Sequence, residues 1–167
     1  MSQSSRAGYA GDCQVSPPYQ IRQLSIEDGM AIAMWRRPGP WAVHDALEPP
    51  REDEGYWAVE DTYGQLVGFC CFGEAARVPG LQETPHMLDV ALGLRPDLIG
   101  HGLSAEVARV VVARAHQVAA GRRLRTVVAA SNTPARRAAE RAGFTVTGAY
   151  DVPGGAAVSS YLVFNQP

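Results

Sequence analysis

The sequence contains no lysine, since all 15 of its basic residues are arginines. A protein without lysine cannot form a Schiff base between a lysine amine and a carbonyl substrate. It also cannot build the common nucleotide-binding phosphate loop, which carries a lysine. These two classes of enzyme are therefore excluded.

Long apolar runs and cysteines are also scarce. No apolar run approaches the ~20 residues of a membrane-spanning helix, and residues 1–18 lack the apolar segment of a secretory signal. The three cysteines include the adjacent pair Cys70 and Cys71, and their spacing fits neither a metal site nor a disulfide framework. We therefore expect a soluble, cytoplasmic protein with no metal and no membrane partner.

The charges that are present are unevenly distributed. Residues 1–94 carry 6 arginines and 13 acidic residues, net −7, whereas residues 95–141 carry 9 arginines and 3 acidic residues, net +6. This asymmetry favours an anionic ligand on the second part and a cationic ligand on the first, although any single charge can equally belong to a solvated helix face. We expect no nucleic-acid partner, and a homodimer is compatible with the sequence.

The apolar pattern predicts one mixed α/β domain over residues 19–167, after a flexible N-terminal tail over residues 1–18. Strands are expected at 19–24, 56–60, 66–72, 87–94, 124–130, 144–150 and 158–164, and helices at 25–35, 41–47, 103–119 and 134–142. The strand, helix and strand over 87–130 form a right-handed crossover with parallel strands. The central sheet should thus be mostly antiparallel, with one parallel strand pair, and flanked by helices.

Local signals mark several of these ends. Ser25 and Asp28 have the spacing of a capping box. Thr133 can cap the helix that starts at Pro134, and Gly143 can end it in the left-handed conformation. A turn is expected at Pro153-Gly154-Gly155.

A glycine-bearing turn, Ile99-Gly100-His101-Gly102-Leu103-Ser104, lies between a predicted strand and the helix that follows it. Glycine lets the backbone approach an anion closely, and the free amides that open a helix attract negative charge. The turn is therefore a candidate pyrophosphate site. Taken alone, the pattern is more typical of a tight turn that binds nothing.

A second block of residues, Asn132 with Ala135 followed by Gly143-Phe144, comes after Leu94-Arg95-Pro96 and Gly102 in the chain. Together with the order of the elements, these residues resemble the GNAT superfamily of N-acetyltransferases. Two positions depart from the superfamily pattern: Ile99 replaces the usual Arg or Gln, and Ser104 replaces Gly or Ala. Because backbone amides make most of these contacts, the departures weaken the match without abolishing it.

This resemblance implies a GNAT-like fold that transfers acetyl from acetyl-CoA to a primary amine of a small molecule or peptide. The pantetheine arm would lie between the strands that end at Leu94 and Ala130, and Arg136 and Arg137 are candidate phosphate contacts. The small residues Ala91 and Gly93 leave room either for a ligand or for a packed neighbour. The predicted cofactor-binding residues are Leu92, Leu94, Ile99, Gly100, His101, Gly102, Leu103, Ser104 and Asn132.

Direct transfer requires a free amine, and often a base that produces it. Asp89 is the first candidate base, because it lies in the central strand on the small-residue face, near where the superfamily often places an acid. A structural role in an ion pair is the alternative for this carboxylate. His86, Glu83 and Glu74 are further candidate bases.

The departing thiolate also takes up a proton. Many superfamily members place a tyrosine four residues before the glycine of the Gly-Phe pair, where this sequence has Ala139. Tyr150 and Tyr161 are candidate acids, Ser131 is another donor, and the thiolate can also leave without a dedicated acid.

The acceptor pocket is expected near Trp35, Trp41, His44 and Asp45, although aromatic residues there more often belong to the core. The acidic residues 52–54, with Glu60 and Asp61, can attract a cationic amine, but such a cluster is more often solvated surface. A degenerate module that binds acyl-CoA without turnover, or a domain that uses the fold alone, is the alternative to an enzyme.

Overall fold

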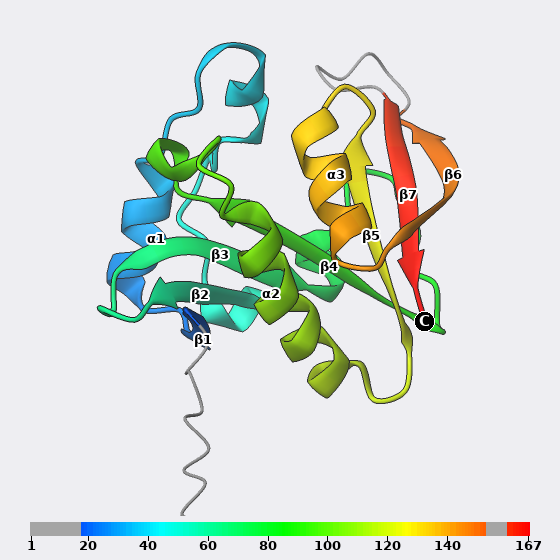
Figure 1. Ribbon diagram of the computed structural model, residues 1–167, viewed down its shortest axis with the longest axis horizontal. Coiled ribbons are helices and arrows are strands. Elements are labelled where there is room, and N and C mark those ends of the chain that lie inside the picture. Colours follow the sequence, from blue (N-terminus) through cyan, green and yellow to red (C-terminus); the bar gives the residue numbers. More distant parts are fainter. Residues whose placement is uncertain (1–17, 153–159) are drawn as a thin grey trace, which may run out of the picture.

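A seven-stranded sheet runs through the computed structural model, which describes residues 18–152 and 160–167 (Figure 1). The strand order is β1-β2-β3-β4-β5-β7-β6, and β4 with β5 is its parallel pair. The other neighbours in the sheet are antiparallel. The strands are β1 (Tyr19–Gln23), β2 (Tyr56–Asp61), β3 (Leu66–Phe72), β4 (Met87–Leu94), β5 (Arg123–Ala129), β6 (Thr145–Asp151) and β7 (Ser160–Gln166).

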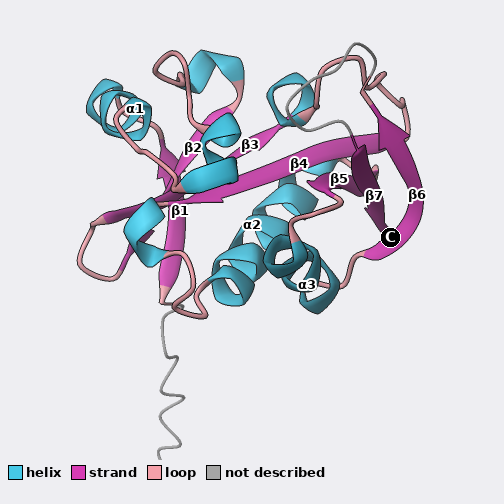
Figure 2. Cartoon of the chain, turned by 90° about the horizontal axis from the view of Figure 1, so that it is seen from above, coloured by secondary structure: helices cyan, strands magenta, loops and turns pink. Residues whose placement is uncertain are grey.

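Helices cover both faces of the sheet. Figure 2 shows α2 and α3 on one face and α1 on the other. The α-helices are α1 (Ile26–Ala33), α2 (Ser104–Ala119) and α3 (Thr133–Arg141), and the short 3-10 helices are η1 (Gly39–His44), η2 (Glu52–Glu54), η3 (Gly73–Ala76) and η4 (Pro96–Leu98). The predicted mixed α/β fold, with one parallel pair in a mostly antiparallel sheet, is confirmed. No helix of the described residues combines the length and the apolar character that crossing a bilayer requires.

The main core lies between the sheet and α2. Val107, Val111 and Ala115 recur every four residues on one face of α2 and are fully buried. They pack in one cluster with Leu124 of β5 and Phe164 of β7. This core fixes α2 across the point where β4 and β5 meet, and so positions the N-terminus of α2 beside the same two strands.

The structure corrects three local predictions. Helix α1 ends at Ala33 rather than near Trp35. The segment predicted as a helix over 41–47 is the 3-10 helix η1, because the flanking prolines and Gly39, at φ 59°, do not fit an α-helix. The cap of α3 is Asn132, whose Oδ1 accepts the Ala135 amide at 3.1 Å, and not Thr133.

Other local signals are confirmed. Ser25 and Asp28 form the predicted capping box at the start of α1. Gly143 has φ 91° and follows α3 as expected. The tail residues 1–17 and the predicted turn at 153–155 lie outside the described residues.

The buried cysteines give a first testable prediction. Cys70 and Cys71 are free and buried in β3, and burial raises the pKa of each thiol to about 12. Since the thiolate is the reactive form, neither should react with a disulfide reagent at pH 8 while the protein is folded. In a Cys13→Ser variant, Cys70 and Cys71 should therefore react with the reagent only as the protein unfolds in urea. Rapid reaction of the native variant would contradict this burial.

Candidate functional site

Strands β4 and β5 separate after a short parallel contact. They pair at three positions, from Met87 with Arg123 to Asp89 with Arg125. Beyond Asp89, β4 still pairs with β3, and β5 with β7. The backbone groups on the facing edges of β4 and β5 lose their sheet partners there and can bind a ligand instead.

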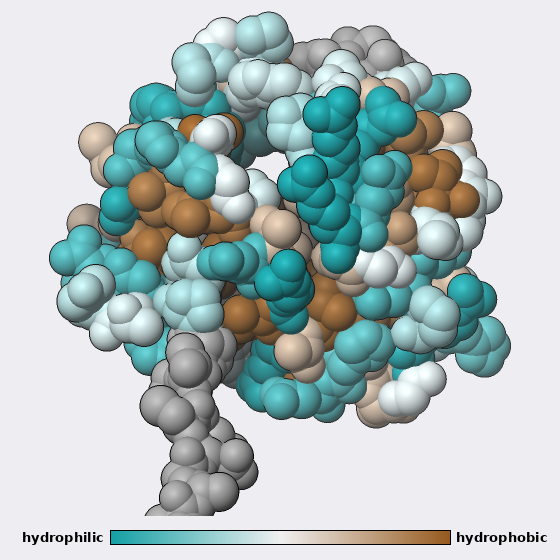
Figure 3. Space-filling model, in the orientation of Figure 1, coloured by the Kyte–Doolittle hydropathy of each residue, from teal (hydrophilic) through white to brown (hydrophobic). Residues whose placement is uncertain are grey.

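A cleft of about 620 Å³ occupies this gap. Figure 3, in the orientation of Figure 1, shows the surface hollowed between the part that carries α1 and the part that carries α3. The walls are the diverging ends of β4 and β5, the first turns of α2, and the small side chains of α3, including Ala135, Ala138 and Ala139. Five of the predicted cofactor-binding residues line the cleft: Leu92, Leu94, Ile99, Ser104 and Asn132.

The other four predicted residues, Gly100, His101, Gly102 and Leu103, form the turn that leads into α2. Gly100 has φ 87° and Gly102 has φ 77°, a conformation that favours glycine. A Cβ atom at either position would meet open space, so the turn presents bare backbone. Access to this backbone is what an anion needs.

The N-terminus of α2 lacks a side-chain cap. The amides of Glu106 and Val107 both donate to the Leu103 carbonyl. The earlier amides of Ser104 and Ala105 have no acceptor within the helix, and the helix dipole adds partial positive charge there. The structure therefore places the uncapped start of a 16-residue helix, an end that favours negative charge, at the cleft.

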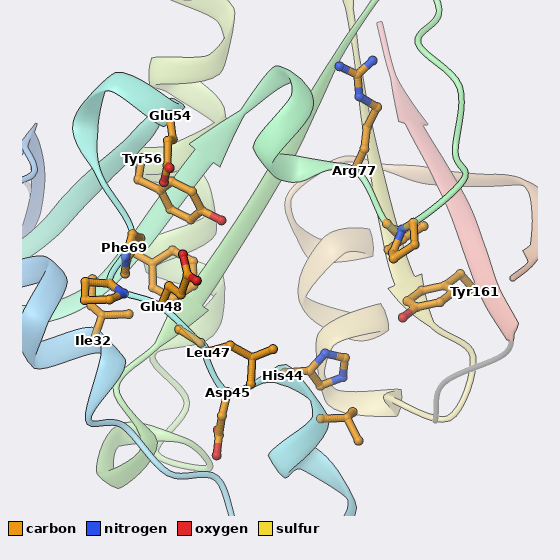
Figure 4. A pocket seen from close by; sticks show the side chains of 16 residues that line it. Ile32, His44, Asp45, Leu47, Glu48, Glu54, Tyr56, Phe69, Arg77 and Tyr161 are labelled. Atoms are coloured by element: carbon orange, nitrogen blue, oxygen red, sulfur yellow. The ribbon is translucent and has the colours of Figure 1, made fainter. Parts of the chain in front are cut away.

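A second pocket, of about 520 Å³, adjoins the cleft (Figure 4). Its walls come from residues 43–50, from β2 and β3, from residues 77–79 and from Tyr161 of β7. Three acidic residues line it: Asp45, Glu48 and Glu54. Six residues line both cavities and so form their junction: His44, Tyr56, Phe69, Arg77, Val78 and Tyr161.

Asp89 is tied into an ion pair. Its two carboxylate oxygens lie 2.6 and 3.0 Å from Nε and Nη2 of Arg125, and both side chains are less than a tenth exposed. Arg77 adds a second guanidinium at 3.8 Å. Arg125 also donates to the hydroxyl of Thr84 and the carbonyl of Gln82, both at 2.9 Å. Asp89 thus joins β4, β5 and the loop before β4, and its predicted role as a base stays untested.

The two candidate acids have different surroundings. Tyr150 is in the edge strand β6, and its hydroxyl donates to the Pro79 carbonyl at 3.1 Å. Tyr161 faces Ala129 across the β5–β7 ladder, where the cleft is open, and lines both cavities. Burial raises the pKa of the Tyr161 phenol, which keeps its proton at neutral pH. Ala139, at the position where many relatives have tyrosine, does line the cleft.

The remaining candidates do not line the cavities, although Glu83 lies 3.7 Å from Arg77 of the junction. The described residues that line the two cavities do not include Glu74, Glu83, His86 or Ser131. Arg136 donates to the Ala130 carbonyl at 3.2 Å, and Arg137 is exposed. The space over Gly93 is filled by the ring of Phe69, 2.5 Å from where a Cβ would be, so a packed neighbour and not a ligand explains that glycine.

The family sequence model of the acetyltransferase (GNAT) domain matches residues 21–145 of this chain. The chain belongs to the GNAT acetyltransferase family. Its cleft lies where strands β4 and β5 separate, as the resemblance of the sequence implied. No curated protein matches the chain in sequence.

Solved GNAT structures share this fold. A GNAT-family acetyltransferase from Bacillus anthracis has a TM-score of 0.69 at 15% identity, over 89% of this chain and 93% of that one. The aminoglycoside acetyltransferase AAC(6')-Ib with coenzyme A and kanamycin has a TM-score of 0.66 at 18% identity, over 89% and 94%. A spermidine N-acetyltransferase SpeG chimera from Vibrio cholerae and hSSAT has a TM-score of 0.67 at 14% identity, over 89% and 95%.

Sequence reasoning missed part of the junction. Tyr56 and Phe69 pack against each other, with ring centroids 5.9 Å apart, and line both cavities. Their sequence signal is that of ordinary strand residues, so no local pattern separates them from the core. The sequence places His44 near the expected acceptor pocket but gives it no chemical role, because only the fold brings it opposite Tyr161.

Proposed function

We propose that this enzyme transfers the acetyl group of acetyl-CoA directly to a primary amine of a small molecule or peptide. The observation that supports this best is the junction, where a cleft between two diverging strands opens into a second pocket. A direct transfer needs two substrates whose reacting atoms meet. Two cavities that share one wall meet this need.

The cofactor side of the proposal rests on the cleft. The pyrophosphate of acetyl-CoA would lie on the turn 99–104, against the free amides at the start of α2. The pantetheine amides would pair with the backbone edges exposed where β4 and β5 separate, beside Asn132. The arginine excess of residues 95–141 provides attraction for the phosphates.

The acceptor side rests on the second pocket. Glu48 and Glu54 line this pocket but not the cleft, and residues 1–94 carry an excess of acidic charge. This charge favours an acceptor that arrives as an ammonium ion. The related AAC(6')-Ib and SpeG are named for aminoglycosides and spermidine, which makes amino sugars and polyamines sensible first acceptors to test.

The chemistry proceeds by attack of the neutral amine nitrogen on the thioester carbonyl carbon. A C–N bond forms, the C–S bond breaks, and the sulfur leaves with the electron pair. We assign Tyr161 as the donor that protonates this thiolate. Its phenol lines both cavities and remains protonated at neutral pH.

Free thiol release tests the activity. The protein is incubated with acetyl-CoA and, separately, with spermidine, kanamycin, glucosamine and a short peptide. Thiol that appears only with an acceptor supports the proposal. Tight acetyl-CoA binding without acceptor-dependent thiol indicates the degenerate binding module instead, and absence of binding excludes both.

Replacement of Tyr161 by phenylalanine tests the acid. We expect kcat to fall about tenfold, less than the roughly 100-fold or more that acid–base catalysis typically contributes, because a coenzyme A thiolate is a weak base. The dissociation constant of acetyl-CoA should be unchanged. Tyr150→Phe is the matched control, since that hydroxyl bonds to Pro79 away from the junction, and it should retain kcat. Equal kcat values in the two variants would remove Tyr161 from the mechanism.

A further inference from the structure

His44 occupies a distinctive place at the junction. Four of the six shared residues ionise: His44, Tyr56, Arg77 and Tyr161. Figure 4 shows the Arg77 guanidinium directed away from His44, and it lies 3.7 Å from Glu83 and 3.8 Å from Asp89. Burial raises the pKa of both phenols, so they donate protons. Among these shared residues, His44 is the one suited to accept a proton at neutral pH.

The segment that carries His44 is held in place by Arg37. The Arg37 guanidinium donates to the His44 carbonyl at 2.8 Å and lies 3.2 Å from Oδ1 of Asp45. The Arg37 amide donates to the same carboxylate oxygen at 3.0 Å. The imidazole stacks on Trp41, with ring centroids 6.4 Å apart and planes inclined by 19°. These contacts orient the ring at the end of η1 without requiring its protonation.

The imidazole faces the proposed acid. In Figure 4 the rings of His44 and Tyr161 point toward one another across the junction. We infer that His44 is the general base that removes a proton from the ammonium group of the acceptor. This inference rests on the proposed function and adds to it a residue from the end of η1.

The protons and electrons balance with this pair. The imidazole takes one proton from R–NH₃⁺ and later releases it to solvent. The nitrogen lone pair of the resulting amine forms the C–N bond, and the C–S electrons leave on sulfur, which takes the proton of Tyr161. The attacking nitrogen then loses its second proton to the tyrosinate, and the products are the amide and free coenzyme A.

The surroundings favour the neutral imidazole. Burial and the charge of Arg37 lower the pKa of His44 below its usual value of 6.5, with Asp45 opposing them. His44 is therefore mostly neutral at pH 7, as a base must be. The other charged and titratable groups that line the two cavities are Arg37, Asp45, Glu48, Glu54, Tyr56, Cys71, Arg77 and Tyr161.

The test compares the wild type with His44→Gln across pH 5 to 9, with spermidine and with the less basic glucosamine as acceptors. In the wild type, kcat/KM should rise along an acidic limb below pH 6.5 that is the same for both acceptors. In the variant, kcat/KM at neutral pH should fall about 10- to 100-fold. The variant's rate should then follow the ionisation of each acceptor's own amine, because only pre-formed free amine reacts.

Chemical rescue separates catalysis from positioning. Added imidazole should restore turnover to His44→Ala, which a purely structural role would not allow, and both variants should bind acetyl-CoA as the wild type does. An unchanged pH profile in His44→Gln, or failure of rescue, would overturn the inference and leave the proposed acetyl transfer intact. A wild type that binds acetyl-CoA but acetylates neither acceptor nor any of the panel would overturn both.

Discussion

The Asp89→Asn variant should lose about 3–5 kcal/mol of its free energy of unfolding, the typical result of breaking a buried ion pair by removing one partner. The carboxylate and its partner Arg125 are each less than a tenth exposed, so water cannot replace the lost contact. Asparagine keeps one oxygen that can accept from Arg125, which favours the lower end of the range. A domain of ordinary stability holds only ~5–15 kcal/mol.

Urea denaturation followed by circular dichroism measures this loss. Asp53→Asn is the matched control, because the Asp53 side chain is 73% exposed and its ion pair with Arg51 lies in water. Its unfolding midpoint should not move. Adding Arg125→Gln to Asp89→Asn should recover part of the lost stability, since the arginine is then no longer buried without a partner. Wild-type stability of Asp89→Asn would contradict the ion-pair assignment.

The same variant separates two roles of Asp89. If the carboxylate acts through Arg125 alone, the folded fraction of Asp89→Asn should keep most of its kcat at low temperature. If Asp89 is the base, kcat should fall sharply even where the protein is fully folded. The pH profile of kcat/KM also distinguishes the two roles. If Asp89 were the base, His44→Gln would keep the pH profile of the wild type.

Much of the fold was predictable because its signals are local. The capping box of Ser25 and Asp28, the proline and glycine at the two ends of α3, and the glycines of the turn before α2 each act within a few residues. A strand, a helix and a strand in sequence permit essentially one handedness of crossover. The cleft between β4 and β5 follows from that order of elements.

The site depends instead on contacts between distant segments. Asp89 and Arg125 are 36 residues apart, and Arg125 reaches back to Gln82 and Thr84 from another strand. No periodicity identifies Arg125 as the partner, so the sequence offers an ion pair for Asp89 only as an alternative to a catalytic role. His44 and Tyr161 likewise come from distant segments, η1 and β7. The cap of α3 was predicted one residue too late. Asn132 and Thr133 are adjacent and both can cap a helix, and only the backbone geometry selects Asn132.

Ser104→Asp should weaken acetyl-CoA binding at least about 100-fold while leaving the fold as stable as before, or slightly more so. A carboxylate on the first residue of α2 interacts favourably with the helix dipole, by about 0.3–1 kcal/mol. The same charge stands where the pyrophosphate would bind. Two unit charges about 5 Å apart near a protein surface repel by roughly 3 kcal/mol, which corresponds to about 100-fold, and the pyrophosphate carries more than one charge.

Calorimetric titration with acetyl-CoA and thermal denaturation together measure these opposite effects. Ser104→Asn provides a neutral side chain of the same size, and it should bind acetyl-CoA within a few-fold of the wild type. Because the repulsion is electrostatic, the defect of Ser104→Asp should shrink as salt rises from 0.05 to about 0.5 M. Equal loss of affinity in both variants would indicate a steric effect at Ser104. Unchanged affinity in Ser104→Asp would mean that the pyrophosphate does not bind at the start of α2.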